Sequence, residues 1–361
     1  MYRILVINPG STSTKSAIFE DRKCIAEQSL AHSTETLNQN PLTWQQVELR
    51  KNCILNWMAD EGLQLKDIDA FAVRGCNIKG CSKGGTYLVN DTIKNEIFSL
   101  HNPDKVAPHA SRLSLPIALS MSESKGVNIP IYITDPPCVN ELSDIAKVSG
   151  HPLFTRESVF HALNSKAVAH RVAEEWGKKY QECKFIVAHM GGGISVGAHS
   201  MGKVVEVNDC ISGGGAFSPN RTGTLPVVPL VELCFSNTYS KDEIIRIIKN
   251  KGGALAHLGT DDMREVEKRI DGGDTHAELI FNAMAYQVAK EIGGCYAALS
   301  CDVDAIIFTG GMANSKRLID EIKKYVEKMG NIKVVPGEYE AEALAFGTLR
   351  VLNKEEDPII L

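Results

Sequence analysis

Three glycine-containing turns in this chain have the composition of a phosphate-binding site. They are Asn8-Pro9-Gly10-Ser11, Met190-Gly191-Gly192-Gly193 and Gly310-Gly311, and each follows an apolar stretch typical of a buried strand. Glycine lets backbone N–H groups approach an anion without obstruction, and turns at strand ends of α/β sheets are where nucleotides bind. Three such turns, two of them in repeated units, predict a cleft between similar domains that holds a polyphosphate.

The first turn is followed by Lys15. Its surroundings, RILVINPGSTSTKSAIFE over residues 3–20, also suit an ordinary β-hairpin. The hydroxyls of Ser11 and Ser13 and the backbone donors near Gly10 favour a phosphate instead. Lys15 lies on an alternating strand, so its side chain points either toward that phosphate or to solvent.

Four other residues could take part in catalysis, and the sequence supports them to different degrees. Arg74 ends the apolar run FAVR, where a guanidinium is costly unless an anion pairs with it. Asp135 ends PIYITD just before two prolines and is either an active-site carboxylate or a turn cap. His161 and Arg221 say little by themselves, because a lone histidine is more often a core residue and a loop arginine is usually ordinary.

The two common phosphate-binding fingerprints do not occur. The chain contains no G-x-x-x-x-G-K-[ST] and no strand-linked G-x-G-x-x-G. This argues against P-loop and Rossmann folds. The pattern instead resembles the actin, Hsp70 and sugar-kinase group, in which a duplicated domain holds nucleotide phosphates between two β-turns.

The order of predicted elements is that of an α/β protein. In the first half, we expect strands at 3–8, 14–20, 23–30, 69–75 and 130–135, helices at 43–60 and 110–125, and an irregular segment at 76–91. In the second half, we expect several strands within 184–209, one strand that begins at 304 and one that begins at 332. We expect helices at 161–180 and 275–300, a third that follows the glycines after the strand at 304 and ends at about 329, and a fourth at about 341–353.

The two halves of the chain repeat each other. The segment KFIVAHMGGGISVGAHSMGKVVEVND matches RILVINPGSTSTKSAIFEDRKCIAEQ element for element, so that Asn8 corresponds to His189 and Gly10 to Gly191. We therefore expect two duplicated domains, 1–150 and 151–361, with the boundary at the glycine and proline of VSGHPLF.

Two helices of the second half are expected to bridge the domains. The helix at about 341–353 is apolar on most faces and should pack back on the first domain. The long apolar helix at 275–300 should lie in an interdomain core.

Composition narrows the class of partner. The chain has 361 residues, which favours two domains, and a net charge of −5 with acidic and basic residues well mixed. No basic stripe suggests a nucleic acid or an anionic membrane, and no apolar run is long enough for a membrane helix. Ten scattered cysteines without C-x-x-C pairs predict free thiols and a cytoplasmic location.

The chain resembles a known family over essentially its whole length. The matching stretches are VINPGSTSTKSA, GGTYLVN, ITDPP, FHALNSKAVA, AHMGGGISVGAH, FSPNRTGTLP, LGTDDMREV, DAIIFTGGMANS and VVPGEYEAEALAFG. They are similar to the butyrate kinases within the acetate kinase family. The resemblance implies two actin-like (ribonuclease H-like) domains with a nucleotide cleft between them.

The activity that the resemblance implies is reversible phosphoryl transfer between ATP and a short-chain fatty acid, giving an acyl phosphate and ADP. By family position, Arg74 binds the substrate carboxylate, and Arg221 and His161 hold the transferring phosphoryl group. Asp135 orients that group or the hydrated metal. Asn8 and Glu340 lie near Mg²⁺, although the neighbouring Glu338 and Glu342 leave the register open.

The resemblance also assigns the nucleotide. It places Ser11, Ser13, Lys15, His189 and Gly191–Gly193 at the ATP phosphates and Gly310, Gly311, Asn314, Asp262 and Arg264 toward the adenosine. Asp262 and Arg264 also suit a plain ion pair at a helix start. The family further suggests a homo-oligomer.

The match loosens beside the expected acyl site. Cys76 and Cys81, in RGCNIKGCSKGGTY, stand where the family more often has small residues or proline. The acid is therefore open among butyrate, isobutyrate, a branched-chain acid and propionate. Two rival functions also stay open: an actin-like assembling ATPase, and a hydroxyl kinase in which Asp135 is a base.

Overall fold

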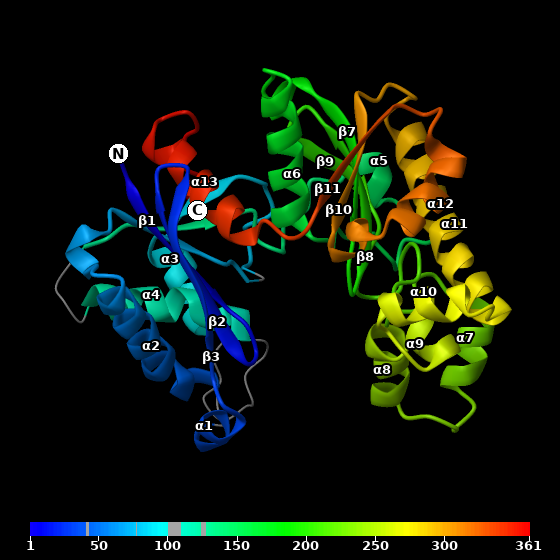
Figure 1. The fold of residues 1–361 in the computed structure, drawn as a ribbon, viewed down its shortest axis with the longest axis horizontal. Helices are drawn as coiled ribbons and strands as arrows, with labels where there is room; N and C mark the ends of the chain where they lie inside the picture. The colour runs from blue at the N-terminus through cyan, green and yellow to red at the C-terminus, as the bar shows by residue number, and fades with distance from the viewer. Residues whose placement is uncertain (41–42, 77, 100–109, 124–127) are drawn as a thin grey trace. The chain divides into compact units, whose positions relative to one another are not determined.

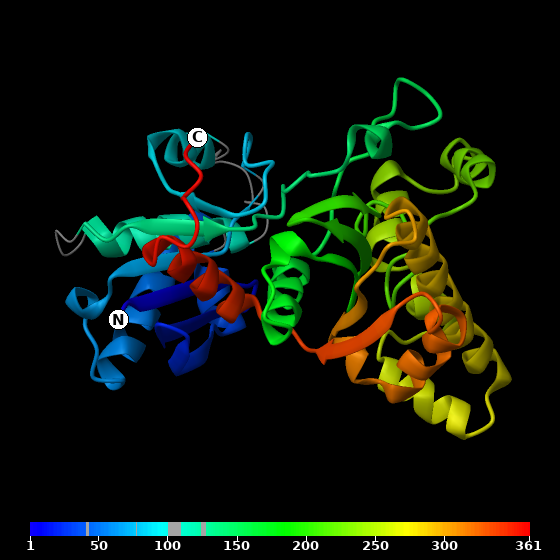
Figure 2. The same cartoon turned by 90° about the horizontal axis from the view of Figure 1, so that it is seen from above.

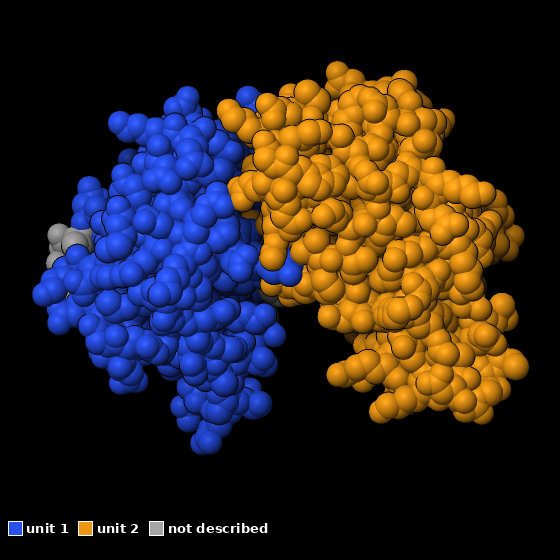
Figure 3. Space-filling view, turned by 45° about the horizontal axis from the view of Figure 1, so that its top comes forward, with its two compact units in different colours: residues 1–139, 339–361 blue, residues 140–338 orange. Residues whose placement is uncertain are grey.

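The computed structural model describes residues 1–40, 43–76, 78–99, 110–123 and 128–361. It divides into two compact units, shown in two colours in Figure 3: unit 1 is Met1–Val139 with Tyr339–Leu361, and unit 2 is Asn140–Glu338. The division falls between residues 139 and 140, whereas the sequence analysis expected it near residue 150. The reason is that the Glu141 carboxylate accepts hydrogen bonds from the Lys166 ammonium and the Val204 N–H, which fastens this segment to unit 2.

Unit 1 contains a six-stranded sheet in the order β3-β2-β1-β4-β6-β5. Its strands are β1 (Arg3–Pro9), β2 (Ser13–Glu20), β3 (Lys23–Ala31), β4 (Ala70–Val73), β5 (Thr86–Leu88) and β6 (Ile131–Thr134). The hairpin strands β1, β2 and β3 are antiparallel, whereas β1, β4 and β6 are parallel. The expectation of an irregular segment at 76–91 was wrong at β5, a three-residue strand too short to show a pattern.

The two faces of this sheet carry different helices. Leu5 and Ile7 belong to the core shared with α2 (Gln46–Asp60) and α4 (Ser114–Glu123). Tyr132 packs with Val351 of α13 (Glu340–Leu352) on the opposite face, because alternate residues of a strand point to opposite sides. The C-terminal helix α13 is thus part of unit 1.

The close approach of α13 to the sheet requires a glycine. A Cβ atom added at Gly347 would lie 2.4 Å from the side chain of Thr134 in β6. The start of α13 meets the end of β1, where the Asn8 side-chain amide donates to the Glu340 carboxylate at 2.8 Å.

Unit 2 contains a five-stranded sheet in the order β11-β10-β7-β8-β9. Its strands are β7 (Lys184–Met190), β8 (Ile194–Ser200), β9 (Lys203–Val207), β10 (Ala305–Gly310) and β11 (Asn331–Pro336). Figures 1 and 2 show α6 (Ala162–Glu175) on one side of this sheet and α11 (Thr275–Ala298) and α12 (Lys316–Val326) on the other. The expectation for 275–300 was wrong, because α11 buries its apolar side chains in the core of unit 2.

The two sheets share one plan. In each, an antiparallel three-stranded hairpin set is followed by two parallel strands, so β1, β2, β3, β4 and β6 correspond to β7, β8, β9, β10 and β11. The strand register shifts at matching places, between Ile18 and Phe19 and between Ala198 and His199. The structure thus confirms an α/β fold with two sheets of duplicated topology.

The remaining helices complete the two units. The α-helices are α1 (Thr34–Gln39), α3 (Asp91–Ser99), α5 (Asp144–Lys147), α7 (Val227–Cys234), α8 (Lys241–Asn250), α9 (Gly253–Leu258) and α10 (Met263–Asp271). Short 3₁₀ turns lie at Thr43–Gln45, Leu65–Asp67, Ala110–Leu113, Tyr180–Glu182 and Gly311–Asn314. Part of the helix expected at 110–125 lies outside the described residues. Within the described chain, no helix has the length and apolar character needed to cross a membrane.

Candidate active site

The glycine turn between β7 and β8 is the centre of the candidate site in unit 2. Its Gly191 N–H donates to the Gly193 carbonyl at 3.0 Å, which closes the turn. Gly310, at the end of the neighbouring strand β10, has a φ of 84°, and an added Cβ would lie 2.4 Å from the Met190 carbonyl oxygen. Only glycine fits there, so two of the three predicted glycine turns lie side by side at one edge of the sheet.

Two histidines stack above this turn. The rings of His161 and His189 have centroids 3.9 Å apart and planes 13° apart. His161 Nδ1 lies 3.0 Å from the Ser195 hydroxyl. His189 Nδ1 accepts from the Asn164 side-chain amide at 2.9 Å, which leaves Nε2 as the protonated nitrogen of the neutral ring.

The protonation state of His189 follows from its surroundings. The ring is 3% exposed, and burial lowers its pKa to about 4. Near neutral pH it is therefore an uncharged donor. An added Cβ at Gly191 would lie 3.6 Å from Nε2, so this donor faces the glycine turn.

Arg221 reaches the same turn from the loop before α7. Its Nη1 donates to the Cys210 carbonyl at 2.8 Å, and an added Cβ at Gly193 would lie 2.1 Å from that nitrogen. The Ser218 hydroxyl donates to the Gly192 carbonyl and accepts from the Arg221 N–H. The guanidinium thus rests against the bare Cα of Gly193, which no other residue type would permit.

Burial raises the pKa of the Cys210 thiol to about 11, despite the nearby Arg221. The thiol therefore stays protonated beside the site.

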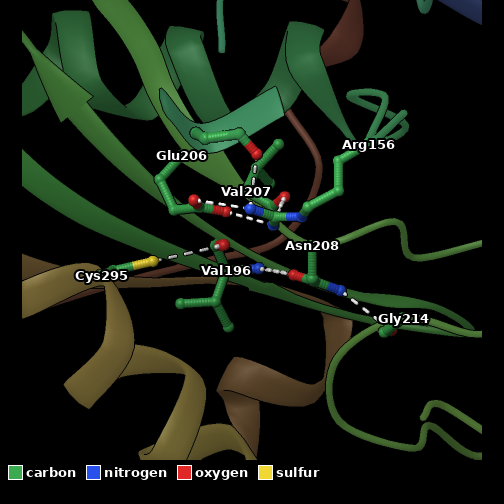
Figure 4. Close-up of polar contacts among 8 residues, drawn as sticks. Arg156, Val196, Glu206, Val207, Asn208, Gly214 and Cys295 are labelled. Atoms are coloured by element: carbon green, nitrogen blue, oxygen red, sulfur yellow. Dashed lines mark hydrogen bonds and ion pairs between the residues drawn. The ribbon is translucent and has the colours of Figure 1, made fainter. Parts of the chain in front are cut away.

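Asn208 joins the two segments that carry these residues (Figure 4). Its Oδ1 accepts from the Val196 N–H at 2.7 Å, and its Nδ2 donates to the Gly214 carbonyl at 3.2 Å. The same Nδ2 also donates to the Ile194 carbonyl at 3.1 Å. Val196 and Ile194 flank Ser195, the partner of His161, and Gly214 begins the loop that leads to Arg221. Sequence analysis missed Asn208, although a polar residue directly after a repeated strand was the available signal.

In unit 1, three predicted residues meet at the start of α13. Glu340 Oε2 accepts hydrogen bonds from Arg74 Nη1 and Asn8 Nδ2, both at 2.8 Å. Asn8 Oδ1 lies 3.4 Å from the same Arg74 nitrogen. The Arg74 side chain remains 35% exposed, so the rest of its guanidinium faces outward. The neighbours Glu338 and Glu342 take no part in these contacts.

Backbone contacts fix Arg74. Its N–H donates to the Ile7 carbonyl at 3.1 Å, and its carbonyl accepts from the Ser114 hydroxyl. A Cβ added at Gly75 would lie 2.7 Å from side-chain atoms of both Ile133 and Pro136. The residue after Arg74 must therefore be a glycine, which packs the Arg74 loop against the end of β6.

Asp135 directly follows β6 and has a left-handed conformation with a φ of 40°. This region is unusual for residues other than glycine, although aspartate tolerates it better than most. The carboxylate is buried, and its Oδ1 accepts from the Gly85 N–H at 2.8 Å. The side chain is thus held in one orientation.

The first glycine turn lies between β1 and β2. Its Gly10 N–H donates to the Ser13 carbonyl at 2.8 Å, as the second turn's Gly191 does to Gly193. Ser11 and Lys15 are exposed, and Lys15 stands opposite Asn8 in the strand register. The buried Arg50 of α2 holds this turn from below, and sequence analysis missed it because nothing distinguishes it from other helix arginines.

The residues expected near the adenosine contact neighbours that are close to them in the sequence. Asp262 caps α10 and pairs with Arg264 at 2.9 Å, and both side chains are exposed. The Arg264 hydrogen bonds lower the pKa of Asp262 to about 2. The structure therefore contains the helix-start ion pair that the sequence also allowed. Asn314 Nδ2 donates to the Gly311 carbonyl at 2.9 Å, within the 3₁₀ turn that follows Gly310.

The donor set in unit 1 can be compared with the needs of magnesium. Among the described residues no group of three or more His, Cys, Asp or Glu side chains forms a metal cage. Glu340 offers one carboxylate and Asn8 one amide. Magnesium keeps several waters and is bound by one or two carboxylates plus substrate phosphates, so this sparse set fits it.

Comparison with known proteins agrees with this fold. An acetate kinase from Porphyromonas gingivalis shares 20% identity over 98% of this chain and 100% of its own, with a TM-score of 0.78. An acetate kinase from Entamoeba histolytica shares 16% identity over 96% and 98%, with a TM-score of 0.76. A propionate kinase from Francisella tularensis shares 18% identity over 96% and 99%, with a TM-score of 0.72.

The family follows from a separate comparison. The model of the acetokinase family matches residues 143–357, which is more than half of the chain. The match includes every residue described above for the turn in unit 2, and also Glu340. The chain therefore belongs to the acetokinase family of carboxylate kinases.

Proposed function

We propose that this protein catalyses reversible, direct in-line phosphoryl transfer from ATP to butyrate or a branched short-chain fatty acid, giving an acyl phosphate and ADP. The observation that carries the proposal is the set of donors around the turn at 191–193. Arg221, His161 and the neutral His189 surround a glycine turn, as the stabilisation of a charged phosphoryl group requires.

The acceptor chemistry agrees with such a set. A carboxylate is already an anion near neutral pH and needs no general base. The transferring group instead needs positive charge and fixed N–H donors at its oxygens. Arg221 supplies the charge in a forked geometry that lysine cannot provide, and His161 and His189 supply donors.

In unit 1, the exposed part of the Arg74 guanidinium would bind the acid. Glu340 and Asn8 would hold magnesium, which when bound neutralises phosphate charge. Asp135, fixed by Gly85, would orient the phosphoryl group or the waters of the metal. The adenosine of ATP or ADP would lie near five residues of unit 2: Gly310, Gly311, Asn314, Asp262 and Arg264. Its phosphates would lie near Ser11, Ser13 and Lys15.

The chain segment after Arg74 is apolar and belongs to the core of unit 1. Cys76, Ile78 and Cys81 are buried, and burial raises the pKa of Cys76 to about 11, so this thiol is an uncharged apolar group. These residues follow Arg74 closely in the sequence, and that position is the basis on which we propose an acid longer than acetate. They do not rank butyrate against its branched isomers, because one methylene is worth only about 1–3 kcal/mol.

A homo-oligomer in the cytoplasm completes the proposal. In α7 and the residue after it, Val227, Val228 and Phe235 are 72, 67 and 81% exposed, and such an apolar surface supports self-association. All ten cysteines are free, which supports a reducing compartment. Light scattering at several protein concentrations, with Val228→Asp as comparison, would test the oligomer.

The acid is identified by steady-state kinetics with Mg-ATP and the acids from acetate to valerate, including isobutyrate and isovalerate. The proposal predicts the highest kcat/KM for an acid of four or five carbons. A preference for acetate would refute the proposed specificity. Turnover of polyols or sugars instead of acids would favour the hydroxyl kinase, and ATP-dependent polymers would favour the assembling ATPase.

A further inference from the structure

Arg50 is a fully buried cation that lies beneath the first glycine turn. It projects from α2, and its side chain is inaccessible to solvent. Its Nη1 donates to the Ser13 carbonyl and the Thr14 hydroxyl at 3.0 and 2.9 Å, and its Nη2 donates to the Ser11 carbonyl at 3.1 Å. Its Nε and Nη2 donate to Gln46 Oε1 at 3.2 and 2.9 Å.

All of these acceptors are uncharged. Burial lowers the pKa of Arg50 from its ordinary value, and no carboxylate among the described residues pairs with it. Arginine nevertheless stays protonated inside proteins. A buried charge normally has a charged partner, because leaving water without one is costly. Among the residues that the structure describes, Arg50 thus has hydrogen-bond acceptors but no counter-ion.

The same contacts set the direction of the turn's backbone. In a trans peptide the C=O of one residue and the N–H of the next point in opposite directions. Arg50 draws the Ser11 carbonyl inward, so the following Thr12 N–H points outward. Ser11 and Thr12 are exposed, and within the described chain neither of their N–H groups donates a hydrogen bond.

We propose that Arg50 is a positioning residue whose counter-ion is the phosphate of the bound nucleotide. It fixes the peptide between Ser11 and Thr12 with its N–H outward, and its charge adds attraction for an anion at the turn. The inference deepens the proposed function, since it rests on that function for the identity of the anion as a nucleotide phosphate.

Gln46 gives the proposal a sharp test. Gln46→Glu is nearly isosteric and can keep both hydrogen bonds from Arg50, but it adds the missing negative charge inside the protein. Gln46→Met removes the same hydrogen bonds and leaves Arg50 without a counter-ion. Each variant also loses the bond from Gln46 Nε2 to the Asn40 carbonyl, so that loss is matched.

The readout is the dissociation constant of ATP and of inorganic phosphate, measured by titration calorimetry on the full chain, together with thermal unfolding. We expect Gln46→Glu to weaken ATP binding about tenfold, the effect of one neutralised charge at short range, without a lower melting temperature. Gln46→Met should bind ATP within about threefold of the parent. Gln28→Glu, which adds the same charge at an exposed position of β3, should also bind normally because surface charges are screened.

Equal ATP affinity in the parent and in Gln46→Glu would overturn the proposal, as would equal losses in the two Gln46 variants, which would indicate a structural role only. Arg50→Lys keeps the charge without the fork and should bind ATP better than Arg50→Met. The proposed function fails differently: if no acid is phosphorylated but the Gln46→Glu effect on ATP is present, the role of Arg50 stands and the acceptor assignment falls.

Discussion

The imidazole of His161 lies face to face with that of His189, with ring centroids 3.9 Å apart. Two stacked imidazoles repel each other when both are protonated. Burial and the Asn164 hydrogen bond keep His189 neutral, so this ring adds no positive charge to the stack.

The first prediction concerns the stability of the fold toward acid. His189 has a pKa of about 4 in the folded protein, below its ordinary value of 6.5, so the unfolded chain takes up the proton first. The contribution of the neutral His189 to the free energy of unfolding is complete above about pH 6.5. It is lost as the pH falls toward 4, at about 1.4 kcal/mol per pH unit.

This prediction is tested by urea unfolding at several pH values between 7.5 and 4.5. His189→Gln should show a free energy of unfolding that falls less steeply with acid, by one proton, than that of the parent. His32 and His199 also have lowered pKa values, of about 4 and about 3, so part of the slope remains in the variant. Identical slopes would show that His189 is not buried as a neutral ring.

The second prediction concerns Arg221. Arg221→Ala should lower kcat about 10²- to 10³-fold, because it removes the cation at the transferring phosphoryl group. The fold should persist, since the side chain makes few contacts, chiefly to Cys210. Arg317→Ala, which removes a surface pair with Asp271, is the matched control and should leave kcat unchanged. A kcat of Arg221→Ala within a few-fold of the parent would refute the assignment.

The third prediction uses the contact between Gly193 and Arg221. In Gly193→Ala the new methyl group would overlap Arg221 Nη1, so the guanidinium must move and kcat should fall at least about tenfold. Gly294→Ala, in α11 with open space around it, should keep full activity and gain about 0.5–1 kcal/mol of stability. Full activity of Gly193→Ala would show that Arg221 acts from another position.

The fourth prediction separates the roles of Arg74 and Glu340. Arg74→Ala should raise the KM of the acid at least about tenfold while ATP binding changes little. Glu340→Gln should raise the magnesium concentration needed for half-maximal rate, and it should leave the acid site intact because the amide still lies beside Arg74. If Arg74→Ala weakens ATP and the acid equally, Arg74 is not the acid-binding residue.

Much of the fold could be predicted because its signals are local. The repeat of an apolar strand, a glycine turn and an alternating strand predicted β1 and β2 within a residue at each end, and it predicted without bounds the two strands that form β7 and β8. Short elements such as β5 could not be found, because three residues give no period. The partner of α11 was also mispredicted, since an apolar helix looks the same in the core of either domain as between them.

The candidate site could be predicted only where a residue had its own signal. Arg74 at a strand end and the glycines of the turns are of this kind. Arg50 and Asn208 are not, because their importance comes from backbone groups distant in sequence, such as the Ser11 carbonyl and the Val196 N–H. For Asp262 and Arg264 the sequence allowed two arrangements, and the structure contains the local ion pair.

The proposed function requires that the phosphoryl acceptor is a carboxylate. The most direct measurement is hydroxylamine trapping of acyl phosphate with Mg-ATP and butyrate, run beside glycerol and glucose with ADP release as a second readout. A carboxylate kinase should give trapped hydroxamate with butyrate, ADP release in step with it, and neither product with the two alcohols. Folded, ATP-binding protein that gives no hydroxamate with any short-chain acid would contradict it.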